Sequence, residues 1–230
     1  HLVIASNSKA MSKLDGSIKN KVYDFFEKLN ADDTQPSLHI EPMKAAIDPR
    51  VRTGRVDLHY RAVLFRVDDK SSGPTYIYMG TWGHDEAIKL AEQATLRVNP
   101  INGTLEGLIG EPAALSADAG SSARTIKAVP EIFYLANVGY ALTDLTDRLG
   151  ISAAVAVRAM AAPNEEALVD AAEGALDWEG SALLDLATGI AIETICEKHG
   201  FTESPVDTGH DDDEQIIKAL DRPASKMQFA

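Results

Sequence analysis

The charged residues of this chain are distributed unevenly along its length. Residues 1–100 carry 14 Lys and Arg against 13 Asp and Glu, whereas residues 101–230 carry 8 against 22. Aromatic residues also become rarer, and alanine more frequent, after about residue 110. Such a change in charge and composition predicts two modules in different electrostatic environments. Of the two, only the first would attract a polyanion, because the second carries a large negative balance.

The boundary between the modules is predicted from a stretch of small and polar residues. Positions 110–122 read GEPAALSADAGSS, which has no sustained hydrophobic period and is typical of a linker. The sequence therefore predicts four regions: an α+β domain over 1–109, a linker over 110–128, a bundle of short helices over 129–202, and an acidic tether over 203–230.

Overall composition excludes several protein classes. Hydrophobic residues make up 45% of the chain and charged residues 25%, as in ordinary globular domains. No apolar run approaches the roughly 18–20 residues that a membrane span requires. The only cysteine, Cys196, allows no intrachain disulfide and no cysteine-based zinc cage. We therefore expect a cytoplasmic setting, no membrane partner and no bound metal, including at the acidic segment around His210.

The first module has the hydrophobic periods of a mixed α and β fold. Apolar positions recur at helical spacing between Gly16 and Asn30, and short apolar or alternating runs predict strands. The predicted class is α+β, with a small antiparallel sheet and helices. Its expected elements are strands at 2–5, 51–56, 60–67 and 75–82, and helices at 16–30 and 85–96.

The second module is helical by pattern. Its apolar periods are interrupted by glycine or proline every two to three turns, so the helices must pack together to be stable. The expected helices span 131–137, 142–149, 152–161, 165–175, 178–186 and 192–199. The segment from 142 to 158 superficially resembles a helix-turn-helix, but its second helix offers only Arg158 to DNA, so we expect a helical spacer or a protein-docking unit.

The strand pair and the strand after it resemble the RelE/ParE toxin superfamily. The matching residues are Arg52-Thr-Gly-Arg-Val-Asp57, Tyr60-Arg-Ala-Val-Leu-Phe65 and Trp82-Gly-His84, which follow two helices in the order seen in those toxins. The resemblance implies a compact α+β platform. In the toxins, basic residues on the sheet cut messenger RNA on the ribosome.

The chain also resembles the N-terminal region of bacterial UvrD-type DNA helicases of superfamily I, in which a toxin-like domain precedes the ATP-driven motor. The resemblance covers most of the chain and is tighter over 1–105. It rests on Ile4-Ala5, Lys13-Leu14, Asp48-Pro49-Arg50, Arg55-Val56-Asp57, Tyr60-Arg61-Ala62, His84-Asp85-Glu86-Ala87 and Val98-Asn99-Pro100, and later on 186–189 and 222–229.

This resemblance implies an accessory region rather than a motor. The sequence contains no G-x-x-x-x-G-K-[ST] phosphate loop, so we expect no cofactor here, and ATP and Mg would belong to the parent helicase. The partners implied are nucleic acid, through the first module, and the helicase's own core. Oligomeric state stays open.

Four arginines are the predicted nucleic-acid-binding residues: Arg50, Arg52, Arg55 and Arg61. If the module cleaves RNA, Arg55 and Arg61 would stabilise the charge that develops on the phosphate, and His84 would transfer a proton. Asp85 and Glu86 stand beside His84, however, and would repel a phosphate.

Structural roles are also open for these residues. The arginines could pair with Asp48, Asp57 and Asp68 or lie at a solvated strand edge, and Arg61 could hold a loop. His84 could cap the following helix together with Asp85. Tyr76, Tyr78 and Trp82, which alternate along one strand, could stack bases or pack in a core on the helix that carries Phe25 and Phe26.

Three functional hypotheses therefore follow from the sequence. The first is a non-catalytic accessory region of a UvrD-like DNA helicase that assists binding of nucleic acid or of the motor domain. The second is a RelE-type endoribonuclease. The third is a protein-interaction or dimerisation module.

Overall fold

A computed structural model describes residues 1–4, 11, 13–69, 73–109, 134–201 and 212–228 of the chain. These residues form two compact units. The first, which we call the sheet unit, combines His1–Val98 with the strand Leu105–Leu108 and the C-terminal helices. The second, the helical unit, comprises Asn99–Thr104 and residues 134–201. The predicted linker at 110–128 lies outside the described residues.

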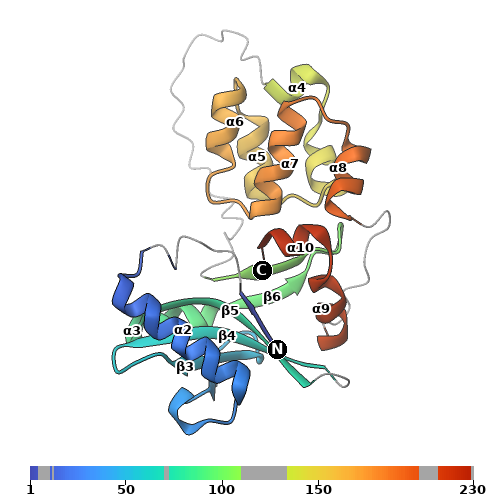
Figure 1. Cartoon of the computed structure of the whole chain (residues 1–230). Helices are drawn as coiled ribbons and strands as arrows, with labels where there is room; N and C mark the ends of the chain where they lie inside the picture. Colours follow the sequence, from blue (N-terminus) through green and yellow to red (C-terminus); the bar gives the residue numbers. More distant parts are fainter. Residues whose placement is uncertain (5–10, 12, 70–72, 110–133, 202–211, 229–230) are drawn as a thin grey trace. The chain divides into compact units, whose positions relative to one another are not determined.

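The sheet unit is built on a five-stranded sheet with the strand order β1-β5-β4-β3-β2 (Figure 1). Strands β2 to β5 pair antiparallel, but β1 runs parallel to β5, so the sheet is mixed rather than purely antiparallel as the sequence predicted. The α+β class is confirmed. The strands are β1 (Leu2–Ile4), β2 (Glu41–Pro42), β3 (Val51–Arg55), β4 (Tyr60–Asp69) and β5 (Gly73–Gly83).

Helix α2 (Gly16–Ala31) covers one face of this sheet (Figure 1). Asp15 caps it, because its carboxylate accepts the N–H groups of Ser17 at 2.7 Å and Ile18 at 3.2 Å. The apolar side of the helix is buried against the sheet, as the helical period predicted. Residues of this core are Ile18, Val22, Phe25, Phe26, Leu29, Leu38, Ala62, Leu64, Tyr76 and Tyr78.

Gly54 on β3 permits this close packing. A Cβ atom at that position would lie 2.6 Å from Cζ of Phe25, well inside van der Waals contact. Any larger residue would therefore push α2 away from the sheet or force Phe25 out of its rotamer.

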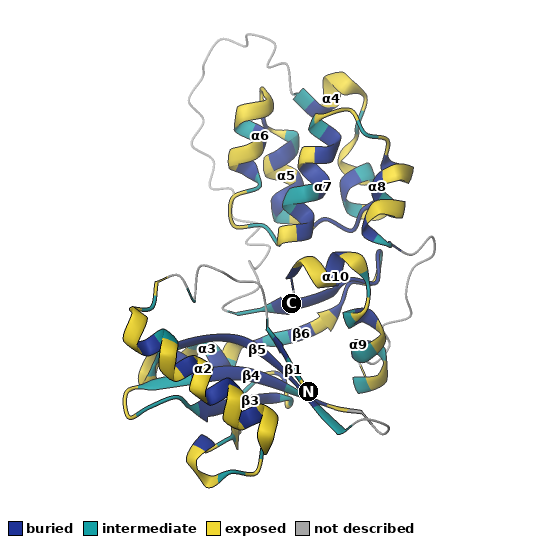
Figure 2. Ribbon diagram, viewed as in Figure 1, coloured by how far each residue is buried: buried dark blue, intermediate teal, exposed yellow. Residues whose placement is uncertain are grey.

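The opposite face of the sheet is covered by helices α3 (His84–Gln93) and α9 (Asp213–Leu220), both of which contact β4. Val63, Phe65 and Val67 on β4 are completely buried there. Figure 2 shows that burial continues along most of β4 and β5, whereas the outer side of α2 is exposed. The sheet is therefore the middle layer of three.

A second, two-stranded sheet pairs β6 (Thr95–Val98) with β7 (Leu105–Leu108), and the sequence reasoning missed it. The helix predicted over 85–96 ends at Gln93, and Leu96 lies in a strand. The C-terminal helix α10 (Pro223–Gln228) covers the outer edge of β7. The N–H of Leu105 donates to Ser225 Oγ at 2.9 Å, and Gln228 Nε2 donates to the Gly107 carbonyl at 3.2 Å.

These contacts change the interpretation of the acidic tether predicted over 203–230. Residues 202–211, including the acidic stretch around His210, lie outside the described residues. The remainder, however, forms α9 and α10, which belong to the sheet unit. Ile216, Ala219 and Ala224 are buried there. Residues 213–220 form an amphipathic helix, and its apolar side is buried in the sheet unit.

The helical unit consists of short helices, as the pattern predicted. Most of the expected spans are found to within a few residues, although the segment predicted as a helix over 142–149 is a single π-helical turn. The elements are α4 (Tyr134–Val138), η2 (Asp144–Arg148), α5 (Ala153–Met160), α6 (Glu165–Ala171), α7 (Asp177–Ala187) and α8 (Ile192–His199).

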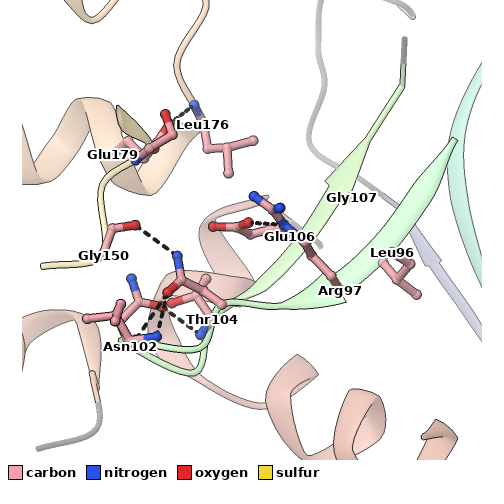
Figure 3. Close-up of polar contacts among 12 residues, drawn as sticks. Leu96, Arg97, Asn102, Thr104, Glu106, Gly107, Gly150, Leu176 and Glu179 are labelled. Carbon is pink, nitrogen blue, oxygen red and sulfur yellow. Dashed lines mark hydrogen bonds and ion pairs between the residues drawn. The ribbon is translucent and has the colours of Figure 1, made fainter. Parts of the chain in front are cut away.

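Residues Asn99–Thr104 form a buried loop in this unit. Asn99 Nδ2 donates to the Gly150 carbonyl at 2.8 Å, and Asn102 Nδ2 donates to the Leu149 carbonyl at 2.7 Å (Figure 3). Gly150 has a φ of 76°, and a Cβ there would lie 2.8 Å from Asn99 Oδ1. Glycine at 150 thus serves both the left-handed turn and the close approach of this loop.

Candidate nucleic-acid interface

The alternation of side chains along β3 separates the four predicted arginines. Arg55 faces the same side as Val51 and Thr53, whereas Arg52 faces the other side. Arg52 is paired in register with Leu64, which belongs to the core under α2. Arg55 is paired in register with Arg61 of β4, on the face that α3 covers. Arg50 precedes the strand, so only Arg55 and Arg61 are brought together.

Arg50 is held inside the fold by Asp48. Its Nε lies 2.8 Å from Asp48 Oδ1, and its second guanidinium nitrogen lies 2.7 Å from Oδ2 and 2.6 Å from the Leu96 carbonyl. Asp48 Oδ2 also accepts the N–H of Leu96 at 3.0 Å. This buried ion pair therefore occupies the N–H and the carbonyl of Leu96, which a neighbouring strand would otherwise bind. Arg50 thus has the structural role that the alternative interpretation predicted.

The charge state of Asp48 follows from these contacts. Burial disfavours its ionised form, but the hydrogen bonds from Arg50 and Leu96 outweigh that cost and hold the pKa of Asp48 below its ordinary value. The pair is accordingly ionised at neutral pH.

Arg52 is bound to backbone rather than to a carboxylate. One of its terminal nitrogens donates to the Pro49 carbonyl at 2.7 Å and to the Val51 carbonyl at 2.9 Å. These bonds secure the entry into β3. They also place Arg52 on the opposite face of the sheet from Arg55 and Arg61.

Arg55, Arg61 and Trp82 lie side by side across three strands, and we call them the arginine row. Arg55 is the register partner of Arg61, and Arg61 is the register partner of Trp82 on β5. The N–H of Val56 donates to the Tyr60 carbonyl at 3.2 Å, so Arg55 and Arg61 form the adjacent, non-hydrogen-bonded pair. Such pairs have Cα atoms about 4.5 Å apart and side chains close together.

The side chain of neither arginine in the row has a hydrogen bond or ion pair to any residue that the structure describes. Both are partly buried, and Arg55 Nε is a buried donor without an acceptor. Like charges directly opposite on neighbouring strands are destabilising, and a buried donor without a partner costs roughly 1–3 kcal/mol. A bound anion would relieve the repulsion between the two guanidinium groups.

Trp82 enters this row because of a β-bulge that the sequence did not reveal. Val63 pairs with Gly80 and Leu64 with Tyr78, so Met79 is an extra residue on β5. The bulge reverses the alternation of β5. The prediction that Tyr76, Tyr78 and Trp82 share one face is therefore wrong.

Tyr76 and Tyr78 lie in the core under α2, as one interpretation predicted. The Tyr78 ring meets Phe26 edge to face at a centroid distance of 4.7 Å. Burial, followed by the hydrogen bond to Asp33, raises the pKa of Tyr76 to about 12. Trp82 instead folds over Gly80, where an added Cβ would lie 2.3 Å from its ring, and it remains partly exposed.

His84 lies next to the arginine row at the start of α3. Its N–H donates to the His59 carbonyl at 2.8 Å, and its Nδ1 lies 2.9 Å from Asp85 Oδ1. The cap residue of α3 is Gly83, and no side chain caps the helix, so the predicted capping role of His84 is not observed. The side chains of His84 and Asp85 are 51% and 96% exposed, so their contact is a weak surface pair.

The sheet unit also contains a cavity of about 580 Å³, whose lining does not include the residues of the arginine row. Its lining includes Ile47, Leu96, Leu108 and Asp213, together with the paired Arg50. Its other arginine, Arg97, bonds the buried Glu106 through Nε at 2.8 Å (Figure 3). Because both cations are already neutralised, this cavity is a poorer anion site than the arginine row.

The arginine side chains of the helical unit bond to carboxylates or to a carbonyl of the same unit. Arg148 bonds Asp144 and Glu193, and Arg158 donates to the Ala171 carbonyl at 3.2 Å. The buried carboxylate of Glu179 accepts the N–H of Leu176 at 2.9 Å (Figure 3) and that of Ser152 at 2.7 Å. Arg158 is therefore bonded within the unit, and a carboxylate lies at the start of α5; both features disfavour contact of this segment with DNA.

The described residues contain neither a metal-ligand cluster nor a membrane-spanning helix. No three His, Cys, Asp or Glu side chains within the described ranges are grouped as metal ligands would be. None of the helices in those ranges has the length and apolar character needed to cross a membrane.

Comparison with known proteins found no matching family model, no similar curated protein and no similar solved structure.

Proposed function

We propose that this chain is a non-catalytic accessory region of a cytoplasmic UvrD-type DNA helicase, and that its sheet unit binds nucleic acid. The observation that carries the binding role is the arginine row. Two adjacent guanidinium groups have no carboxylate partner among the described residues, in a chain with 35 acidic and 22 basic residues. In a protein with this excess of carboxylates, two unpaired neighbouring arginines are most simply explained by an external anion.

The link to a helicase is supported by the sequence resemblance. Several matching motifs have structural roles in this fold: Asp48 and Arg50 bind the backbone of β6, and Asn99 organises its loop. Arg55 and Arg61 belong to matching motifs too, yet their side chains bond to none of the described residues. Among the motif arginines, these two are thus available to a ligand.

The geometry favours binding over RNA cleavage. Cleavage requires a general base near the attacking 2′-hydroxyl and cations around the phosphate. His84 is the nearest candidate base, but it contacts Asp85, and Asp85 and Glu86 are both exposed at the same place. These carboxylates would oppose the extra negative charge of the transition state.

The binding role is tested by fluorescence anisotropy with an internally labelled single-stranded oligonucleotide, as DNA and as RNA. We expect Arg55→Gln and Arg61→Gln each to weaken binding about tenfold. Arg66→Gln is the matched control, because Arg66 lies on the opposite face of β4 and pairs with Asp68 at 3.0 Å. Absence of binding, or an equal loss in the control, would refute a nucleic-acid interface at this row.

The other two parts of the proposal have separate tests. The coding sequence beyond the Ala230 codon should contain a G-x-x-x-x-G-K-[ST] loop within several dozen codons, and its absence would refute the helicase assignment. Incubation with end-labelled RNA should leave the RNA intact. Cleavage that disappears in Arg61→Gln would instead identify a RelE-type ribonuclease.

A further inference from the structure

The arginine row presents two positive charges at one point rather than a line of charges. Arg55 and Arg61 are direct neighbours across two strands, and the other arginines of β3 and β4 are turned away or paired. An internal phosphodiester carries one negative charge, so a single such group would leave one guanidinium uncompensated. A terminal phosphate carries about 1.5–2 negative charges at neutral pH and has three acceptor oxygens.

The surroundings of the row disfavour a polyanion that continues in both directions. Asp85 and Glu86 are exposed at the start of α3, and Asp57 lies in the turn that joins β3 to β4. Asp57 is neutralised by Lys21 at 2.9 Å, but Asp85 and Glu86 have no lysine or arginine partner among the described residues. A chain of phosphates passing these carboxylates would be repelled, whereas the last phosphate of a chain would not.

Trp82 completes the row on the other side of Arg61. Its indole is partly exposed and is held against Gly80. Stacking of one base on an aromatic ring contributes about 1–3 kcal/mol and requires the base to be unpaired. The row therefore combines a place for one doubly charged phosphate with a place for one unstacked base.

We propose that the arginine row binds the phosphorylated end of a single-stranded nucleic acid, with Arg55 and Arg61 sharing the terminal phosphate and Trp82 contacting the terminal base. This inference rests on the proposed nucleic-acid-binding function and deepens it. It names the phosphomonoester as the chemical group recognised. The polarity of the strand is an outcome of the test.

The experiment compares internally labelled dT10 with a 5′-phosphate, with a 3′-phosphate, or with hydroxyl groups at both ends. We expect one phosphorylated form to bind at least tenfold more tightly than the hydroxyl form. That preference should fall to about onefold in Arg55→Gln and in Arg61→Gln, and remain in Arg66→Gln. Circular dichroism of each variant confirms that the fold is retained.

Salt dependence supplies a second measurement. Two phosphate charges neutralised on a single strand predict a log–log slope of about −1.4 for the association constant, far shallower than for a long basic groove. A slope as steep as that of a long basic groove would contradict recognition of a single terminal phosphate.

The possible outcomes are distinct. If none of the oligonucleotides binds, the proposed function itself is refuted. If all bind equally well and Arg61→Gln weakens all of them, the proposed function stands and end recognition is refuted. If the end preference persists in both glutamine variants, the phosphate is bound elsewhere and the inference is also refuted.

Discussion

The sheet unit and the helical unit use their positive charges differently. In the helical unit, Arg148, Arg158 and Lys198 bond to carboxylates or to a backbone carbonyl. In the sheet unit, Arg50, Arg66 and Arg97 are also paired, but Arg55 and Arg61 have no partner among the described residues. Among these arginines, those without a described partner thus lie together on one face of one sheet.

The comparison also shows that the position of an arginine along a strand decides its role. Arg50 directly precedes β3 and Arg55 ends it, five residues later, and both belong to motifs in which the sequence resembles UvrD-type helicases. Arg50 serves a neighbouring strand through Asp48, whereas Arg55 stands opposite another arginine. Predictions that separate these two kinds of arginine test the proposal most directly.

The largest effect is expected for Asp48→Ala. This substitution leaves the Arg50 guanidinium buried without its carboxylate and removes the acceptor of the Leu96 N–H. Breaking a buried ion pair by removing one partner costs about 3–5 kcal/mol. Urea denaturation should show this loss, whereas Asp68→Ala, which removes an exposed partner of Arg66, should cost less than about 1 kcal/mol. Equal losses of stability in Asp48→Ala and Asp68→Ala would mean that the Arg50 ion pair contributes no more to stability than the Arg66 ion pair.

A slightly smaller effect is expected for Ile216→Ala on α9. Ile216 is completely buried in the sheet unit, and truncation of a buried isoleucine costs about 2–5 kcal/mol. Lys218→Ala on the same helix is the control, because its side chain is 73% exposed. Denaturation of both variants gives the comparison. A negligible loss for Ile216→Ala would restore the interpretation of this segment as a tether.

The sequence predicted some elements of the fold better than others. Helix α2 and strands β4 and β5 were predictable because each spans ten or more residues with a clear recurrence of apolar positions. The contribution of helix α9 to the sheet unit was underestimated because the helix has only eight residues and lies within an acidic stretch. Strands β6 and β7 were missed because each has four residues and β7 contains Glu106, whose burial depends on Arg97.

The candidate site was predictable only in part. Arg55 and Arg61 were identified from the motifs. Their direct pairing depends on the hairpin register, and the presence of Trp82 beside them depends on the bulge at Met79. Neither is encoded in a local pattern. The commitment of Arg50 to Asp48 and Leu96 likewise depends on contacts between distant residues.

In the helical unit, His199 should make stability depend on pH. Burial lowers the pKa of His199, and the nearby Asp185 carboxylate, with Oδ2 at 3.4 Å from Nε2, only partly opposes this. The unfolded chain therefore binds the proton more tightly than the folded chain. The stability that neutral His199 contributes is fully present above the unfolded pKa of about 6.5, and it is lost as the pH falls.

The measurement follows Trp178, which is buried in the same unit and contacts Phe201. In a Trp82→Phe background, urea denaturation by tryptophan fluorescence reports on this unit alone. Stability should decrease from pH 7 to pH 5 less steeply in His199→Phe than in the parent. The same slope in both would show that His199 does not titrate on unfolding.

The smallest effect is expected for the stability of Arg61→Gln, and its sign is the sharpest test of the comparison. If Arg61 faces Arg55 without an internal partner, replacing it removes a repulsion between directly opposed like charges. The gain should be about 0.2–1 kcal/mol at low salt and should vanish at about 1 M salt, where the screening length is near 3 Å. Arg66→Gln, which loses its contact with Asp68, should not be stabilised. A destabilised Arg61→Gln would mean that Arg61 is bonded internally like Arg50, and the arginine row would then be part of the scaffold instead of an anion site.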